Sequence, residues 1–144
     1  MATQYTGGTV AGQILTAATM NSIGAAWETW TPTLGATGGG ALGSTTINLA
    51  RYAQIQKCVF FQFSVSITSV GTASGRLTFT LPLTAQATTA TNLAIGSGYE
   101  WQATTLQINC YKTSTTVAAI IFGNGNNSVV NGYTMTLTGM YEAA

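Results

Sequence analysis

The chain has 144 residues, about the length of one domain, and 46% of them are hydrophobic, which excludes a fully disordered chain. Only 5% are charged, with no histidine and no aspartate, against about a quarter in an average domain. This near-neutral composition argues against a nucleic-acid partner, which is held by stripes of lysine and arginine, and it disfavours a freely soluble monomer. The 27 threonines can instead coat the solvent face of strands with uncharged polar groups.

The N-terminal part predicts a segment for attachment and oligomerisation. Residues 1–16 read as an extended arm, and residues 17–28 predict a short helix with Met20, Ile23 and Trp27 on one face. A helix this short needs a partner, either copies of itself around a symmetry axis or its own β-domain, and both stay open. We assign Met20, Ile23, Trp27 and the nearby Trp30 to oligomerisation, and residues 1–33 to an arm, helix and linker.

Residues 34–144 predict an antiparallel β-sandwich or jelly roll of about seven to eight strands. After a glycine-rich loop at 35–40, apolar and polar residues alternate with period two, most clearly at 58–68. Strands are predicted at 45–50, 51–56, 58–68, 77–81, 93–101, 106–110, 117–122 and 133–141. The predicted inner face of the 58–68 strand comprises Val59, Phe61, Phe63, Val65 and Ile67. The predicted sandwich core includes Phe61, Phe63, Phe79 and Ile121.

Side chains for catalysis, metal binding or cofactor binding are scarce. Without histidine, the Ser-His and Cys-His nucleophile arrangements are excluded, and the carboxylates are Glu28, Glu100 and Glu142 alone. Of these, Glu100 with Glu142 is the pair that a glycoside hydrolase would have to use. Ligands for zinc or calcium are lacking as well. We therefore expect no enzyme, no cofactor and no metal.

Targeting signals and disulfides are not expected either. No apolar run approaches the roughly 18 residues that cross a bilayer, and no basic stretch precedes an apolar block at the N-terminus, so we expect neither membrane insertion nor a signal peptide. Cys58 and Cys110 each lie inside an apolar run, which predicts buried free thiols, and pairing between neighbouring strands stays open.

Short motifs along the chain resemble those of bacteriophage tail-fibre and minor tail proteins. In chain order they are GQILTAA at 12–18, MNSI at 20–23, WTPT at 30–33, ARY at 50–52 with QIQK at 54–57, GRLTFTLP at 75–82 and LTGMY at 137–141. The chain departs from the family pattern in the hairpin turn, where the family glycine is Gln56.

The resemblance implies a virion protein, commonly trimeric, in which the N-terminal arm attaches a compact β-domain to other virion proteins. We expect a tail-fibre or receptor-binding subunit that forms a homotrimer, located in the phage particle and assembled in the host cytoplasm. A capsid cement or decoration protein is the alternative, and a carbohydrate-binding module outside any virion is a third possibility.

A receptor-binding subunit of this kind would bind a host-surface glycan through aromatic rings and neutral amides on loops. The candidates are Tyr99, Trp101, Asn124, Asn126 and Asn127. Each has a simpler structural interpretation, because asparagine suits a glycine-rich turn and tryptophan often packs in a core. The two segments are also far apart in the sequence.

Overall fold

The structure, a computed structural model, describes residues 26–88 and 92–144. The helices and strands found in these residues are all β-strands, with no helix among them. The predicted all-β class is therefore confirmed. The strands are β1 (Glu28–Thr29), β2 (Leu34–Ala36), β3 (Ser44–Ile55), β4 (Cys58–Ser69), β5 (Leu77–Thr80), β6 (Leu93–Glu100), β7 (Gln107–Lys112), β8 (Val117–Phe122) and β9 (Tyr133–Glu142). The two strands predicted at 45–56 form a single strand, β3.

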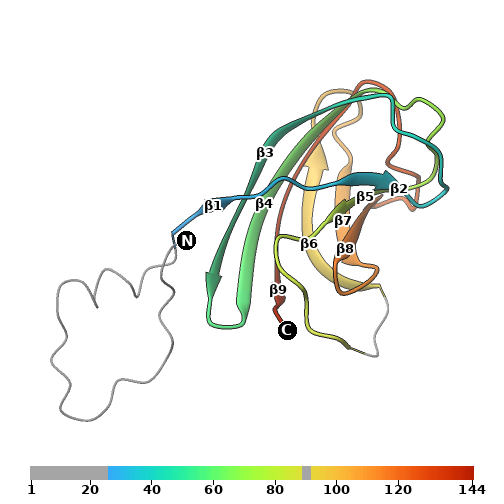
Figure 1. The fold of residues 1–144 in the computed structure, drawn as a ribbon. Helices are drawn as coiled ribbons and strands as arrows, with labels where there is room; N and C mark the ends of the chain where they lie inside the picture. The colour runs from blue at the N-terminus through green and yellow to red at the C-terminus, as the bar shows by residue number, and fades with distance from the viewer. Residues whose placement is uncertain (1–25, 89–91) are drawn as a thin grey trace, which may run out of the picture.

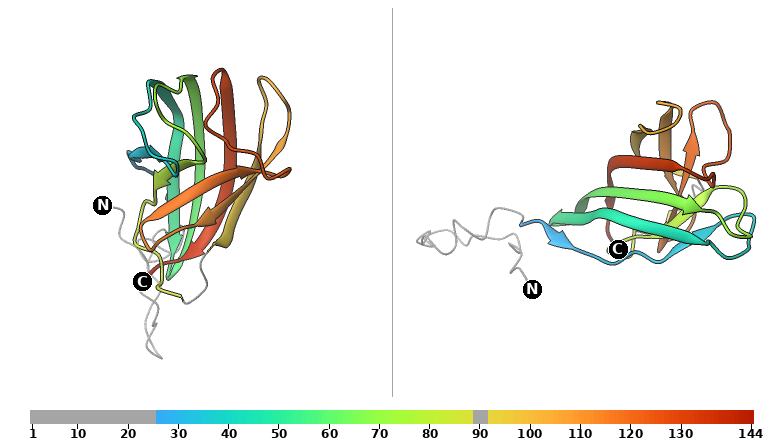
Figure 2. Two further views of the ribbon diagram at one scale, coloured as in Figure 1. Left: turned by 90° about the vertical axis from the view of Figure 1, so that its right-hand side faces the viewer. Right: turned by 90° about the horizontal axis from the view of Figure 1, so that it is seen from above.

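All nine strands belong to one antiparallel sheet, in the order β1-β3-β4-β9-β6-β7-β8-β5-β2. The sheet curls like half a barrel, so that its two halves face each other (Figures 1 and 2). A sandwich or jelly roll of two sheets was predicted, and the structure has one continuous sheet instead. The reason is that β6 pairs with both β9 and β7, which keeps the two halves hydrogen-bonded to each other.

No helix occurs in the part of the chain that the structure describes, and hence none there is long and apolar enough to cross a membrane. The predicted helix at 17–28 falls mostly on residues 1–25, which lie outside the described residues, as do Met20 and Ile23. At its predicted end the chain is extended, because Glu28 pairs with Tyr52 of β3.

The inside of the curl holds the hydrophobic core. The predicted alternation in β4 is confirmed, since its inner side chains are at most 1% exposed: Val59, Phe61, Phe63, Val65 and Ile67. Phe63 stacks on Phe79 of β5, with ring centroids 4.5 Å apart, and Phe61 lies 6.1 Å from the ring of Phe79. These contacts join the two halves of the sheet.

One residue of the predicted core is misplaced. Ile121 is only partly buried, whereas its neighbour Ile120 is fully buried. In the register of β7 and β8, Ile121 lies opposite Asn109. The run Val117–Phe122 is apolar at every position, so its sequence gave no alternation from which the inner side could be read.

Strands β1 and β2 are consecutive in sequence but lie at opposite edges of the sheet. The segment 28–36, called the closing segment below, therefore crosses the open side of the curl (Figure 1). Trp30 lies near its middle and contacts both edges. Its backbone N–H donates to the carbonyl of Ala50 in β3 at 3.2 Å, and its indole Nε1–H donates to the carbonyl of Thr80 in β5 at 3.1 Å.

The closing segment revises three expectations. Trp30, assigned to oligomerisation, is partly buried and packs against the core of its own domain. The β-domain begins before the predicted boundary at residue 34, since β1 belongs to the sheet. Gly35 and Ala36, predicted in a loop, form β2 because they pair with β5.

The hairpin between β3 and β4 turns at Gln56 and Lys57, between the paired residues Ile55 and Cys58. Gln56 has a φ of 53°, in the left-handed region, and Lys57 does not have a positive φ. A positive φ at the first of two loop residues is the pattern of a type II′ turn, which favours glycine at that position. Gln56, which stands where the family pattern has glycine, is therefore the one residue of this loop with a positive φ.

Candidate functional site

Two segments singled out in the sequence converge at one end of the sheet. Tyr99 of β6 pairs with Gln107 of β7, and the N–H of Gly123, after β8, donates to the carbonyl of Gln107 at 2.8 Å. Since neighbouring strands lie about 4.8 Å apart, the backbones of Tyr99 and Gly123 are about 10 Å apart. We call this region, with Trp101 and the turn at 123–127, the aromatic–amide end.

The aromatic side chains of this end are exposed. Tyr99 is 54% exposed and Trp101 is 53% exposed, although tryptophan was more expected in the core. Tyr99 projects from the outer face because Gly98, its neighbour in β6, lies opposite the inward-facing Leu137 and Ile108. Trp101 follows the strand, and its N–H donates to the carbonyl of Thr134 at 3.1 Å. Both rings are open to a ligand.

The turn at 123–127 carries three exposed asparagines. The side-chain oxygen of Asn124 accepts a hydrogen bond from the N–H of Asn126 at 3.0 Å, and Gly125 has a φ of 85°. Asn124 therefore closes the turn, which is the structural role that an asparagine in a glycine-rich segment was expected to have. Asn126 and Asn127 add exposed amide groups beside it.

Gln107 and Asn109 also belong to this surface, and the sequence analysis did not select them. Both project from the outer face of β7, where Gln107 is exposed and Asn109 is partly buried. Opposite them across the sheet stand Tyr99 and Ser97 of β6. The alternation at 106–110 marked both residues as outward-facing, but only the strand order shows that they bridge the two candidate segments.

The carboxylate of Glu100 lies beneath this surface and is fully buried. It accepts hydrogen bonds from the backbone N–H groups of Gln102, Ala103, Thr104 and Thr134, and from the hydroxyl of Thr104, at 2.6–3.2 Å. Burial by itself would raise the pKa of Glu100, but these donors outweigh it and lower the pKa to about 2. The side chain is therefore charged at neutral pH.

A glycosidase-like pair of Glu100 and Glu142 does not form. Glu100 pairs with Met135 of β9, and Glu142 lies seven residues further along that strand. At about 3.3 Å per residue this separates the two by roughly 23 Å, whereas hydrolase carboxylates stand about 5–9.5 Å apart. Glu100 is also buried with its oxygens already hydrogen-bonded.

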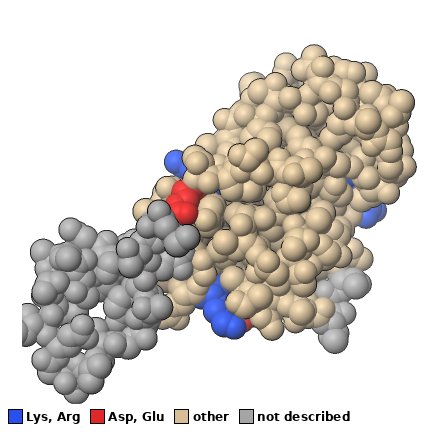
Figure 3. Space-filling view, in the orientation of Figure 1, with Lys and Arg blue, Asp and Glu red and all other residues tan. Residues whose placement is uncertain are grey.

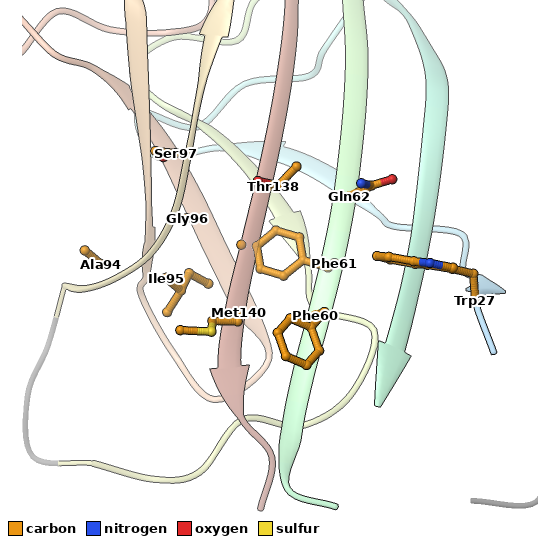
Figure 4. A pocket seen from close by; sticks show the side chains of 11 residues that line it. Trp27, Phe60, Phe61, Gln62, Ala94, Ile95, Gly96, Ser97, Thr138 and Met140 are labelled. Carbon is orange, nitrogen blue, oxygen red and sulfur yellow. The ribbon is translucent and has the colours of Figure 1, made fainter. Parts of the chain in front are cut away.

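An open groove of about 610 Å³ lies on the same outer face, nearer the β3–β4 hairpin (Figure 4). Its most exposed apolar side chains are Trp27, which is 46% exposed, Phe60 and Met140. Phe60 and Met140 are paired across β4 and β9, and the guanidinium carbon of Arg51 lies 4.8 Å from the ring centroid of Trp27. Trp27 thus keeps the exposure that its assignment to oligomerisation requires.

Charged and metal-binding groups are sparse in the described residues. On the face shown in Figure 3 charged side chains form a few isolated spots. Within residues 26–88 and 92–144 no three His, Cys, Asp or Glu side chains gather to hold a metal ion. Cys58 and Cys110 are free, and they lie on β4 and β7, which are not neighbours in the sheet.

Comparisons of the chain with protein-family models, with curated proteins and with solved structures find no match.

Proposed function

We propose that this chain is a non-enzymatic structural protein of a bacteriophage particle, a tail-fibre or receptor-binding subunit that assembles as a homotrimer. In this proposal the aromatic–amide end binds a glycan of the host surface, and the groove at Trp27, Phe60 and Met140 contacts a second copy of the chain. The observation that carries the proposal is the convergence of exposed aromatic rings and neutral amides at one end of an almost uncharged sheet.

The chemistry of the aromatic–amide end suits a sugar. The C–H faces of a pyranose pack against aromatic rings, and Tyr99 and Trp101 supply exposed rings. Sugar hydroxyls need neutral donors and acceptors, and Gln107, Asn126 and Asn127 supply both in their amide groups. An anionic or cationic ligand would find no opposite charge among these side chains. A neutral glycan is therefore the ligand class that this surface supports best.

The distance between the groove and the aromatic–amide end supports separate roles for the two surfaces, one in assembly and one in ligand binding. Met140 lies in the groove, while Trp101 is hydrogen-bonded to Thr134, six residues away along β9. At about 3.3 Å per residue the two surfaces are roughly 20 Å apart. Trp27 also belongs to residues 1–33, the N-terminal part that the resemblance assigns to attachment. Assembly at the groove would leave the aromatic–amide end open to a receptor.

The motifs at 50–57, 75–82 and 137–141, which carry part of the resemblance, lie in or next to strands of the sheet. ARY and QIQK lie in the β3–β4 hairpin, and GRLTFTLP covers β5 and ends at Pro82, just after the strand. LTGMY lies in the second half of β9. QIQK includes the hairpin turn and GRLTFTLP includes a strand end, as the resemblance implies for a hairpin and a strand, and this supports placing the chain with phage tail proteins.

A glycan array tests the ligand. We expect the wild type to bind a defined set of neutral glycans, and Trp101→Ala and Asn126→Ala to weaken binding at least about tenfold, in line with the loss of one stacking platform or hydrogen bond. Thr68→Ala, on an exposed position of β4, is the control and should bind like the wild type. If the wild type binds no glycan, the proposed ligand class is wrong. If both variants bind as the wild type does, the binding site lies elsewhere.

The copy number per purified particle tests the location. A tail-fibre subunit should be present in tens of copies, and hundreds of copies would instead indicate a capsid decoration protein.

A further inference from the structure

The loop after β6 is organised around a buried carboxylate. The Oε1 atom of Glu100 accepts the N–H groups of Gln102 at 2.8 Å and Ala103 at 3.0 Å, and Oε2 accepts the N–H of Thr104 at 2.6 Å. The Thr104 hydroxyl adds a bond to Oε2 at 2.8 Å. Three consecutive N–H groups thus point at one anion, and the loop 101–105 folds around its own preceding residue.

The same carboxylate ties this loop to β9. The N–H of Thr134 donates to Oε1 at 3.2 Å, and the hydroxyl of Thr134 donates to the side-chain oxygen of Gln102 at 2.6 Å. The N–H of Trp101 donates to the carbonyl of Thr134. Trp101 is therefore held between two residues that are both bonded to the start of β9.

No lysine or arginine stands in the segments packed against Glu100. The loop and the start of β7 (101–109) and the start of β9 (133–136) contain no Lys, Arg, Asp or Glu, and their neighbouring titratable groups are Tyr99 and Tyr133. Hydrogen-bond donors of the backbone replace a counter-ion here, which stabilises the charged form of the carboxylate. An aliphatic side chain in this place would leave these N–H groups without their acceptor, which is most costly for the buried N–H of Thr134.

We propose that Glu100 is a positioning residue: its carboxylate holds the loop 101–105 against the start of β9 and thereby fixes Trp101 on the outer surface. Trp101 is more than half exposed, so core packing contributes little to its position and the backbone of the loop determines it. The part that Trp101 takes in glycan binding rests on the proposed function, whereas the positioning by Glu100 does not.

The proposal implies a defined response to acid. The carboxylate of Glu100 has a pKa of about 2 in the folded protein, below the ordinary glutamate value of 4.5. The contribution of a group with a depressed pKa is complete above its unfolded value and is lost as the pH falls toward its folded value. The loop should therefore stay in place at neutral pH and loosen between about pH 4.5 and 2.

Amide hydrogen exchange measured by NMR tests the positioning. In Glu100→Gln, a side chain of the same shape that places an N–H₂ group against the N–H donors, we expect the amides of Gln102, Ala103, Thr104 and Thr134 to exchange at least about tenfold faster. Amides of the core strand β4 should keep their protection. Glu142→Gln, which removes an exposed carboxylate at the far end of β9, is the matched control and should change none of these rates. Unchanged exchange at 102–104 in Glu100→Gln would overturn the proposal.

If Glu100→Gln does not fold, an acid titration of the wild type takes its place. The side-chain carboxyl carbon of Glu100 and the amides of residues 102–104 should then shift together as the pH falls from about 4.5 to about 2. Loop amides that do not respond when Glu100 is protonated would also overturn the proposal. Neither measurement needs a ligand, so failure of the glycan array leaves this result standing. If the wild type does bind a glycan, Glu100→Gln should weaken that binding and Glu142→Gln should not.

Discussion

The indole N–H of Trp30 donates a hydrogen bond to the backbone carbonyl of Thr80, fifty residues later in the chain, at 3.1 Å. The bond is reinforced by a reciprocal pair close by: Thr33 N–H donates to the Thr80 hydroxyl at 2.9 Å, and Thr80 N–H donates to the Thr33 carbonyl at 3.1 Å. On its other side Trp30 lies against the rings of Tyr52 and Phe63. A single side chain thus joins β3, next to one edge of the sheet, to β5, next to the other.

Replacing this indole should destabilise the domain. Trp30→Phe removes the donor to the Thr80 carbonyl and leaves a smaller ring in the same space, so we expect a loss of about 2 kcal/mol in the free energy of unfolding. Trp101→Phe is the control, because Trp101 is exposed and lies away from the groove, and it should change stability by less than about 0.5 kcal/mol. Urea denaturation measures both. Equal losses in the two variants would show that Trp30 does not join the edges.

Truncation of the central core ring should have a larger effect. Phe63 is fully buried and stacks on Phe79, so Phe63→Ala should lower the free energy of unfolding by about 3–5 kcal/mol. Thr68→Ala, at an exposed position of the same strand outside the groove, should lower it by less than about 1 kcal/mol. A melting temperature that Phe63→Ala leaves unchanged would contradict the assignment of the inner face.

The hairpin turn offers a stabilising substitution. Gln56 has a positive φ, which strains a residue with a Cβ, and glycine adopts this conformation without that strain. We expect Gln56→Gly to raise the free energy of unfolding by up to about 1 kcal/mol, after allowing for the greater entropy of glycine in the unfolded chain. Lys57→Gly, at the neighbouring position without positive φ, should give no gain. A loss of stability in Gln56→Gly would contradict the turn type.

The two thiols should differ in reactivity. Burial raises the pKa of the Cys110 thiol, and this side chain is fully buried, whereas Cys58 is partly exposed. Only a thiolate reacts rapidly with a disulfide reagent. In native protein at pH 8 we expect one thiol to react quickly and the second only on unfolding, and Cys58→Ser should abolish the fast phase. A fast phase that survives in Cys58→Ser would show that Cys110 is accessible.

Self-association should depend on the groove. Light scattering at micromolar concentration should give the mass of three chains. Met140→Glu places a charge in the groove beside Phe60 and should shift the mass toward that of one chain. Gln107→Glu adds the same charge at the aromatic–amide end of the same face and should leave the trimer intact. A monomeric wild type would contradict the homotrimer.

The strands that could be predicted from the sequence are those whose two faces differ. The alternation around Phe61 and Phe63 marked β4 and its inner face. Pro82 marked the end of β5, the strand that precedes this proline. The closing segment could not be predicted, because β1 and β2 have two and three residues and form only through pairing with distant strands. The curl of the single sheet depends likewise on β9, which pairs between β4 and β6.

The candidate site was predictable in its residue types and not in its geometry. Tyr99, Trp101 and the asparagines of the 123–127 turn were selected by their chemistry. Their proximity depends on Gln107, whose strand lies between the two segments. The role of Glu100 was likewise hidden, because its partners are backbone N–H groups, which every residue except proline carries.

The closing segment also constrains the order in which the chain can fold during synthesis. Residues 28–36 leave the ribosome before every other part of the described sheet, yet their partners are β3 and β5, and β5 ends at residue 80. Strand β4 waits longer still, because its second partner, β9, is the last strand of the described sheet to be made. Residues 34–36 must therefore remain undocked until residue 80 has been made, and pairings this distant in sequence fold slowly. A cell making this protein therefore holds its core open on one side until β9 has been made.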